Sequence, residues 1–357
     1  MNRKRKILHY VHYDNKFILN QINFLKKNFS EKVEQKFYVY GAPRRFYKGF
    51  CGDVSPFNIY AIPGFLLGAF SSDRIVLNGL FSRKNVALFT IFPYILKKAV
   101  WIPWGHDLYW RQAAPLSLKD KIYIKIQKFF MKNLYAIATQ TPGDYNAAVD
   151  WYGGNTKYIE GACSLFEFDY KDLDLLIKNK DVNTGPTIQI GNSADPSNNH
   201  FELIEKLSKF SAENIEIVAP LAYGDIQHAN KVIEFGKKIF GSKFRPIISF
   251  QSPESYNKHL SLINVLIFNH RRQQGFGNIL IALYLGCKVF IDQQVATYKY
   301  LKDHLGCKIY DASEIYLLKK EELFNNEKDA VNLNREIIRK FFNVEWQVLS
   351  WEKVFFD

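Results

Sequence analysis

The sequence lacks the cysteine and hydrophobic patterns of several protein classes. Its 357 residues include four cysteines, and no two have the CxxC spacing of a zinc or redox site. This usage fits a reducing cytoplasm better than a disulfide-stapled fold. The longest apolar run, 86–96, falls well short of the ~20 residues that span a bilayer, and the short run after the basic N-terminus is too interrupted for a signal peptide. We therefore expect a cytoplasmic protein whose membrane contact is peripheral.

Signatures of other ligands are missing as well. No GxGxxG motif is present, which argues against a nicotinamide-dependent oxidoreductase. The one D-x-D pair, Asp172 and Asp174, lies in a lysine-rich helical pattern and not in a loop after a strand, so neither a metal nor a cofactor is expected. Basic low-complexity tracts and nucleic-acid modules are absent, and no nucleic-acid partner is expected. The formal charge of +13 then favours another phosphate-rich partner, a nucleotide or a membrane.

What is present indicates two folded α/β domains. The chain is 47% hydrophobic and exceeds the size at which one core usually keeps growing. In the first half, short β-type runs alternate with longer helical stretches, as in a parallel sheet with crossover helices. The runs are 6–11, 36–40, 74–77, 99–102 and 136–139. We expect an N-terminal domain over 1–165 and a turn-rich linker over 166–185.

The second half has the alternation of a doubly wound sheet. The expected strands are 187–190, 215–219, 246–248, 265–268 and 288–291, and the expected helices are 199–210, 226–239, 254–262 and 278–285. We expect a second domain over 186–332 and terminal helices over 333–357 that pack back on the body. Open sheets of this kind bind ligands at the carboxyl ends of their strands, so the loops after the strands are the candidate sites.

The loop after strand 265–268 combines glycines with arginines. It contains Arg271, Arg272, Gln273, Gln274, Gly275, Gly277 and Asn278. Glycines let backbone N–H groups approach a phosphate, a helix N-terminus adds partial positive charge, and arginine supplies a bidentate donor. An ordinary turn with Asn278 as helix N-cap is the alternative. Two arginines and two glutamines exceed what such a turn needs, which favours a diphosphate site.

Two further loops of this domain carry candidate ligand groups. Small polar residues follow the domain's first strand: Gly191, Asn192, Ser193, Asp195, Ser197 and Asn198. They suit phosphate or sugar binding, and they suit helix capping by Ser197 or Asn198 equally well. Tyr223, after strand 215–219, offers a ring to stack on a base, although surface tyrosines in turns are common.

In the first domain, His106 and Asp107 follow strand 99–102 beside several aromatic rings. An Asp in such surroundings has the raised pKa of a general base, and the rings suit a sugar. The alternative is a polar pair that orients the loop. His12 and Asp14, after the first strand, are the second candidates for catalysis.

A lysine stripe, Lys121, Lys125, Lys128 and Lys132, follows one face of a helical stretch. Such a helix can lie on an anionic membrane surface. A solvated face of a core-packed helix explains the same pattern.

Taken together, several motifs resemble a known family. They are Trp104-Gly105-x-Asp107-Leu108-Tyr109, Gly143-Asp144, the loop from Gly191 to His200, Pro220 with Tyr223, and Arg272-Gln273-Gln274-Gly275-x-Gly277. The sequence resembles the bacterial TDP-N-acetylfucosamine:lipid II N-acetylfucosaminyltransferase family over nearly its whole length. That family adds 4-acetamido-4,6-dideoxygalactose (Fuc4NAc) to a polyprenyl-diphosphate-linked disaccharide in enterobacterial common antigen synthesis.

The resemblance implies a GT-B glycosyltransferase: two Rossmann-like domains facing a cleft, acceptor on the N-terminal side, nucleotide on the C-terminal side, and no essential metal. It implies that the Gly191 and Arg272 loops hold the TDP diphosphate and that Asp107 or Asp14 lies near the acceptor hydroxyl. It further implies an undecaprenyl-diphosphate-linked acceptor and a peripheral position on the cytoplasmic face of the inner membrane.

The resemblance is weaker in the first domain, where the loop 78–81 keeps only Gly79 and Phe81 of the family pattern. The acceptor therefore stays open, with an O-antigen or capsule precursor as an alternative. A Rossmann-like protein that binds a nucleotide or polyanion without turnover is the rival function.

Overall fold

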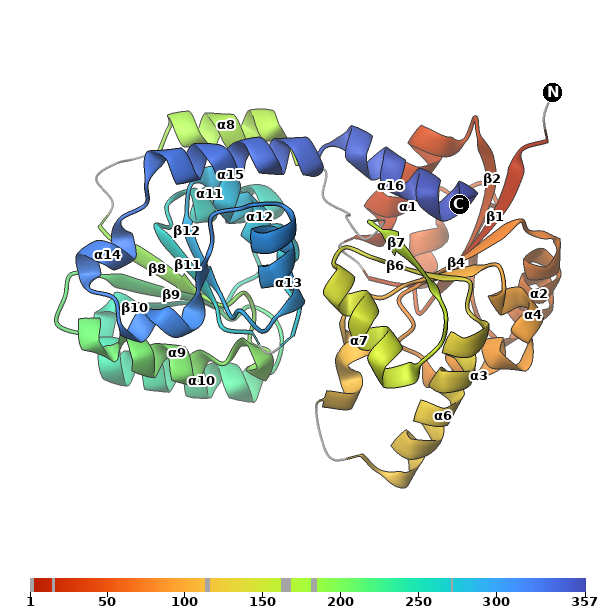
Figure 1. The fold of residues 1–357 in the computed structure, drawn as a ribbon, viewed down its shortest axis with the longest axis horizontal. Helices are drawn as coiled ribbons and strands as arrows, with labels where there is room; N and C mark the ends of the chain where they lie inside the picture. Colours follow the sequence, from red (N-terminus) through yellow and green to blue (C-terminus); the bar gives the residue numbers. More distant parts are fainter. Residues whose placement is uncertain (1–2, 15–16, 113–115, 162–167, 181–184, 271) are drawn as a thin grey trace. The chain divides into compact units, whose positions relative to one another are not determined.

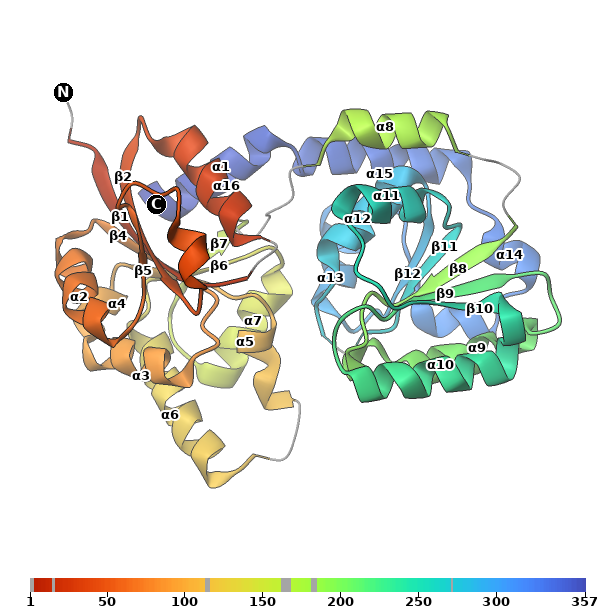
Figure 2. The same ribbon diagram turned by 180° about the vertical axis from the view of Figure 1, so that it is seen from behind.

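The structure is a computed structural model that describes residues 3–14, 17–112, 116–161, 168–180, 185–270 and 272–357. The chain forms two compact units: unit 1 is Met1–Leu165 with Val344–Asp357, and unit 2 is Phe166–Asn343. Each unit is built around its own sheet, with helices on both faces (Figure 1; Figure 2).

Within the described residues, unit 1 has a seven-stranded parallel sheet in the order β3-β2-β1-β4-β5-β6-β7. Its strands are β1 (Arg5–His12), β2 (Val33–Tyr40), β3 (Val54–Pro56), β4 (Arg74–Asn78), β5 (Ala99–Ile102), β6 (Ala136–Thr139) and β7 (Lys157–Glu160). Its α-helices are α1 (Ile18–Phe29), α2 (Ile62–Ser71), α3 (Arg83–Ile91), α4 (Pro93–Leu96), α5 (His106–Tyr109), α6 (Leu118–Asn133), α7 (Pro142–Tyr152) and α16 (Val344–Phe356). The short 3₁₀ turns are η1 (Arg44–Tyr47), η2 (Ile59–Ala61) and η3 (Trp110–Gln112).

The described part of unit 2 has a six-stranded parallel sheet in the order β10-β9-β8-β11-β12-β13. Its strands are β8 (Thr187–Ile190), β9 (Glu216–Pro220), β10 (Phe244–Ile247), β11 (Val265–Phe268), β12 (Lys288–Ile291) and β13 (Tyr310–Asp311). Its α-helices are α8 (Tyr170–Lys178), α9 (His200–Leu207), α10 (Ile226–Phe240), α11 (Pro253–Ser261), α12 (Phe276–Leu285), α13 (Ala296–Lys299), α14 (Lys320–Phe324) and α15 (Lys328–Phe341). The 3₁₀ turns are η4 (Pro196–Asn198), η5 (Ser208–Phe210), η6 (Gly241–Lys243) and η8 (Ala312–Tyr316), and η7 (Tyr300–His304) is a π-helical turn.

Both sheets share one winding scheme. Numbered within its own unit, each begins with strand order 3-2-1-4-5-6, the Rossmann order. The expected pair of Rossmann-like domains is thus confirmed. The winding reverses between β1 and β4 in unit 1 and between β8 and β11 in unit 2. Ligands of such sheets bind outside the carboxyl ends of the strands at this reversal.

Two apolar layers hold each sheet. In unit 1, α1 and α16 cover one face, and α2, α3, α6 and α7 cover the other. In unit 2, α9 and α10 pack on one face and α11 and α12 on the opposite face. The central strands are buried on both sides, which explains why β5, β8, β11 and β12 are buried along their whole length.

The segment expected as a linker, 166–185, contains the helix α8. Leu173, Leu176 and Ile177 follow helical spacing and pack on the α12 side of unit 2. The two terminal helices belong to different units: α15 packs on α12, whereas α16 completes the α1 face of unit 1.

In the described part of the chain, every helix is too short or too polar to cross a membrane.

Candidate functional site

In unit 2, the loops after β8 and β11 meet at the reversal of the sheet. The two strands pair directly, and the helices that follow them, α9 and α12, pack on opposite faces. This divergence brings the two predicted loops together at one edge (Figure 1).

Three side-chain contacts link these loops, and Arg272 and Gln274 make two of them. Arg272 Nη2 lies 2.9 Å from Asp195 Oδ2, and Gln274 Nε2 donates to Ser197 Oγ at 3.1 Å. Ser197 Oγ donates in turn to Asp195 Oδ1 at 2.6 Å. Burial alone would raise the pKa of Asp195, but the hydrogen bonds from Ser197 and the charge of Arg272 outweigh it, and the pKa is lowered. Asp195 is therefore ionised at neutral pH and aligns the Arg272 guanidinium.

The guanidinium keeps donors for a ligand. Of the guanidinium nitrogens of Arg272, only Nη2 donates to Asp195, and the Arg272 side chain is partly exposed. Gln273 is also partly exposed. Arg271 lies outside the described residues.

Asn198 shapes the β8 loop from inside. It is fully buried, and its Oδ1 accepts from the backbone N–H of Asn192 at 2.9 Å and lies 2.8 Å from His270 Nε2. Its Nδ2 donates to Ser193 Oγ at 3.2 Å. Gly191 has φ 66°, and a Cβ there would lie 2.6 Å from Asn198 Oδ1. A glycine at 191 is required by this close approach.

Tyr223 is anchored beside the same loop. Asn192 Nδ2 donates to the Tyr223 hydroxyl at 3.2 Å, and the Tyr223 carbonyl accepts from Ala194 N at 2.7 Å. The ring is 45% exposed. Asn192 Oδ1 is buried with no partner among the described residues. This amide oxygen is thus available to a ligand beside the Tyr223 ring.

Helix α12 presents its N-terminus to the loops. Gly275 is the N-cap with φ 66°, and among the described residues no side chain caps the first turn, which contains Gly277 and Asn278. The helix begins two residues earlier than expected, so Asn278 is not the N-cap. A Cβ at Gly275 would lie 3.1 Å from Phe268 and 3.3 Å from Asn192. The free N–H groups of this turn and the helix dipole favour an anion.

Two buried histidines, His200 and His270, adjoin the site; His200 is part of the family-like motif, whereas His270 was not singled out from the sequence. Burial lowers the pKa of His270 well below its ordinary value, and burial followed by the charge of His228 lowers the pKa of His200 to about 3. Both are neutral at pH 7. His270 follows β11 directly, and that position was the available signal.

In unit 1, the loops after β1, β4 and β5 are adjacent because these strands are neighbours. Asp107 lies at their junction and is only 4% exposed. Its carboxylate accepts from Leu80 N at 2.9 Å, Trp104 N at 2.8 Å and Trp101 Nε1 at 3.2 Å. Burial raises its pKa, and these hydrogen bonds oppose the rise. This geometry favours the alternative in which Asp107 orients the loop.

His12 is in a different setting. Its ring centroid lies 4.7 Å from that of Phe81, and Phe81 stacks at 6.2 Å on the exposed His106. His12 Nδ1 is buried and has no partner in the described part of the chain. Burial lowers the His12 pKa, and the charge of Asp14 opposes the shift. The ring is therefore a neutral base at pH 7.

The retained positions of loop 78–81 support this arrangement. Gly79 has φ 75°, and a Cβ there would lie 2.9 Å from the Phe81 ring and 3.2 Å from His12 Cβ. Asp14 Oδ1 accepts from Phe17 N at 3.2 Å near the start of α1. Gly79 and Phe81 are thus the residues that hold His12 in place.

Two other family-like positions pair with each other. The Tyr109 hydroxyl donates to Asp144 Oδ1 at 2.6 Å, and Thr141 Oγ1 donates to Asp144 Oδ2 at 2.7 Å. Burial raises the pKa of Asp144, and these bonds oppose it. The pair ties α5 to α7 and is structural.

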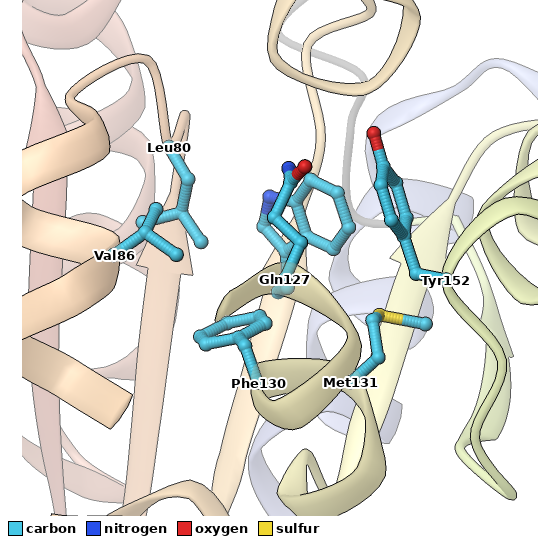
Figure 3. A pocket seen from close by; sticks show the side chains of 7 residues that line it. Leu80, Val86, Gln127, Phe130, Met131 and Tyr152 are labelled. Carbon is cyan, nitrogen blue, oxygen red and sulfur yellow. The ribbon is translucent and has the colours of Figure 1, made fainter. Parts of the chain in front are cut away.

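A small cavity lies in the core of unit 1 (Figure 3). Leu80, Val86, Phe130, Met131 and Tyr152 surround the Gln127 amide there, and Trp101 completes the lining. Its volume of about 10 Å³ matches a single water, so it is a packing defect and not a sugar site.

Metal ligands are not grouped in the described residues, where no three His, Cys, Asp or Glu side chains are placed to share an ion. Asp174 is on α8, pairs with Arg339 and accepts from the Tyr284 hydroxyl at 2.7 Å. Asp172 is on the same helix.

Several solved structures share the fold, and each aligns with nearly the whole chain. The Anabaena protein Alr3699/HepE in complex with UDP-glucose matches with a TM-score of 0.66 and 13% identity, covering 98% of this chain and 99% of that chain. Sucrose-phosphate synthase from Thermosynechococcus elongatus matches with a TM-score of 0.66 and 12% identity, covering 99% and 98%. WaaG, a glycosyltransferase involved in lipopolysaccharide biosynthesis, matches with a TM-score of 0.62 and 9% identity, covering 99% and 100%. The fold is that of GT-B glycosyltransferases.

The sequence itself matches one family over most of its length. Residues 71–356 match the family described as 4-alpha-L-fucosyltransferase, glycosyl transferase group 56. That range includes the loops after β4, β5, β8 and β11. The chain therefore belongs to the 4-alpha-L-fucosyltransferase family, glycosyl transferase group 56, and is a glycosyltransferase.

Proposed function

We propose that this glycosyltransferase moves Fuc4NAc, or a close 6-deoxy amino sugar, from a TDP donor to a polyprenyl-diphosphate-linked oligosaccharide in surface polysaccharide synthesis. The family membership and the motif resemblance support a fucose-like sugar. The Anabaena neighbour was solved with UDP-glucose, which supports a nucleotide-sugar donor.

The observation that carries the donor assignment is the contact of Arg272 with Asp195 at the N-terminus of α12. As the bond from the anomeric carbon to the diphosphate breaks, negative charge grows on the leaving TDP. The guanidinium and the free N–H groups of α12 are fixed where they would stabilise that charge. Because the guanidinium and the backbone N–H groups would stabilise the negative charge of the diphosphate themselves, we propose that the transfer needs no metal. Gln274, Ser197 and Asn192 would complete the phosphate and sugar contacts.

Tyr223 fits the nucleoside part of the donor. Its hydroxyl is held by Asn192 while its ring is 45% exposed, an arrangement that suits stacking on a base.

For the acceptor, we propose that His12 takes the proton of the attacking hydroxyl. The new bond forms between that oxygen and the anomeric carbon, the bond to TDP breaks, and the proton passes to the His12 imidazole. Its neutral ring at the carboxyl end of β1 supports this role. Asp107 then acts as a positioning residue, and His106 and Asp14 flank the acceptor. The lipid-linked acceptor places the enzyme at the inner-membrane surface.

Transfer assays with the full chain test this proposal. TDP-Fuc4NAc, UDP-sugars and GDP-fucose are offered with a short-chain polyprenyl-diphosphate disaccharide, with and without EDTA, and products are identified by mass spectrometry. We expect transfer only from the TDP donor, unaffected by EDTA, and thermal stabilisation by TDP. Turnover with GDP-fucose in place of the TDP-sugar would overturn the donor assignment.

The rival function, nucleotide or polyanion binding without turnover, is disfavoured by the family membership. It predicts thermal stabilisation by TDP with neither transfer nor donor hydrolysis for any acceptor.

A further inference from the structure

Helix α2 of unit 1 buries Phe65 and Ala69 against the sheet but exposes apolar side chains on its outer face. A surface helix normally places charged residues on its outer face. In α2, Leu67 is 73% exposed. The ten residues of this helix include no charged side chain. Solvation alone does not explain such an outer face.

The turn before α2 extends this apolar face. Ile59 is 74% exposed and Tyr60 is 91% exposed. The turn is ordered, because the Asn58 side chain accepts hydrogen bonds from Tyr60 N at 3.0 Å and Ala61 N at 3.1 Å. The two large side chains are thus held outward by a capped 3₁₀ turn.

The neighbouring helices continue the face. Phe70, at the end of α2, is half exposed and lies 6.3 Å from the ring of Phe92, between α3 and α4. Ile91 and Tyr94 beside it are each 68% exposed. Figure 2 shows α2 and α4 side by side at this edge of unit 1. We define the docking surface as Ile59, Tyr60, Leu67, Phe70, Ile91 and Tyr94.

The charges around the docking surface are almost all positive. Residues 59–98 include five basic residues, of which Arg74 is buried and Arg83 pairs with Asp120, and one acidic residue, Asp73. Asp73 contacts Arg3 and accepts from the backbone N–H of Lys6. Lys98 Nζ donates to the Phe70 carbonyl at 2.9 Å, so a cation adjoins the apolar residues directly.

Helix α6 supplies a second row of positive charge. It carries five lysines and one acidic residue, Asp120, which pairs with Arg83. Its exposed apolar residues, Leu118, Ile122 and Phe129, occupy one flank, and Asn133 on that flank lines the same surface pocket as Lys97 after α4. The predicted lysine stripe, Lys121, Lys125, Lys128 and Lys132, is exposed next to this flank.

We propose that the docking surface inserts into the headgroup layer of an anionic lipid bilayer, with the α6 lysine stripe contacting the lipid phosphates. Exposed aromatic and aliphatic side chains within a basic rim suit an interface with apolar depth and negative charge. A water-exposed protein partner would not require an uncharged helix. The proposal deepens the proposed function, because a lipid-linked acceptor resides in such a layer.

Sedimentation of the full chain with lipid vesicles, without sugar donor or acceptor, tests the surface. Vesicles contain phosphatidylcholine alone or equal parts of phosphatidylcholine and phosphatidylglycerol. We expect the triple variant Tyr60→Ser/Leu67→Ser/Phe70→Ser to bind the mixed vesicles at least about tenfold more weakly than wild type. The matched control is Tyr316→Ser/Leu317→Ser in unit 2, where the exposed fractions are 58% and 66%. It should bind like wild type.

The lysine stripe is tested with Lys→Gln at 121, 125, 128 and 132, against the same change at exposed lysines 231, 237, 238 and 258. At about fivefold per lysine near an anionic surface, the stripe variant should lose at least tenfold and the control little. Wild-type binding to the mixed vesicles should also exceed binding to phosphatidylcholine alone.

Three results would overturn the proposal: wild type that ignores both vesicles, a triple variant that binds like wild type, or a dimer in solution that the triple variant abolishes while vesicles stay unbound. Failure of the proposed function is separable. Thermal stabilisation by TDP and transfer to a water-soluble acceptor report on the site alone, and the triple variant should keep both.

Discussion

Replacing Arg272 should slow the chemical step more than it weakens the fold. Arg272→Ala removes the guanidinium that Asp195 holds at 2.9 Å next to the N-terminus of α12. The ion pair is partly exposed, so its loss should cost less than about 1 kcal/mol of stability. A fixed donor to the developing charge of a leaving group is typically worth roughly 2.7–4 kcal/mol, so kcat should fall by about 10²–10³-fold.

Steady-state kinetics with the TDP donor measure this effect. Arg272→Lys keeps the charge and loses the planar fork, so it should recover only part of kcat. Arg245→Ala is the matched control. Arg245 forms a comparable surface ion pair with Glu216, with Nε and Oε1 2.6 Å apart, and this pair does not belong to the site loops. We expect the control variant to keep wild-type kcat.

The reasoning would be refuted by Arg272→Ala with full kcat and full donor affinity. It would also be refuted if the loss of activity followed the loss of folded protein, measured by thermal unfolding under the assay conditions. Asp195→Asn separates the two roles further: if Asp195 only aligns the guanidinium, this variant should lose less kcat than Arg272→Ala.

Three other changes test the rest of the site. His12→Gln should lower kcat by about 10²–10⁴-fold, whereas exposed His106→Gln should have a small effect; since burial lowers the His12 pKa, wild-type kcat/KM should stay flat down through pH 6.5 and fall only below it. Asp107→Ala should destabilise unit 1 by roughly 3–5 kcal/mol in urea unfolding, because three buried N–H donors lose their acceptor; Asp107→Asn with wild-type stability but no activity would instead restore Asp107 as the base. Acid should weaken unit 2 first, because burial lowers the pKa of His200 to about 3, of His259 to about 4 and of His270 well below 6.5. The unfolded chain therefore binds more protons than the folded chain below pH 6.5, and the free energy of unfolding should fall by about 4 kcal/mol between pH 7 and 5.5. Limited proteolysis as the pH is lowered should then cut unit 2 before unit 1.

Buried strands were the most predictable part of the fold. The strands β5, β6, β8, β11 and β12 occur at the predicted residues, because a strand covered on both faces is a continuous apolar run. The short edge strands β3, β7 and β13 were not predicted, since edge strands are brief and partly polar. Helix α12 begins before its predicted start, because Gly275 adopts φ 66° and the helix opens at Phe276, a conformation that composition alone does not reveal.

The linker and the C-terminus were harder because they depend on tertiary packing. Helix α8 shows helical spacing only over Leu173, Leu176 and Ile177, a stretch too short to distinguish from a polar connection. The chain passes from unit 2 to unit 1 between α15 and α16 because the two helices bury their apolar residues in different units. Helix α15 packs on α12 of unit 2, and Trp351 and Phe355 of α16 are buried in unit 1.

In the candidate site, too, residues that are contiguous in sequence were easier to predict than residues placed by distant segments. The proposed phosphate site uses glycines, an arginine and a helix start that are contiguous in sequence, so the sequence alone was enough to propose the Arg272 loop. The proposed proton acceptor has no such run: His12 packs against Phe81 and close to Gly79, and burial lowers its pKa. The role of Asp107 is hard to infer for a different reason. A loop Asp beside aromatic rings has the composition of a base, and sequence does not reveal that its carboxylate accepts three hydrogen bonds, one of them from the distant Leu80. Residues that act on a ligand and residues that hold a loop therefore look alike until their hydrogen-bond partners are known.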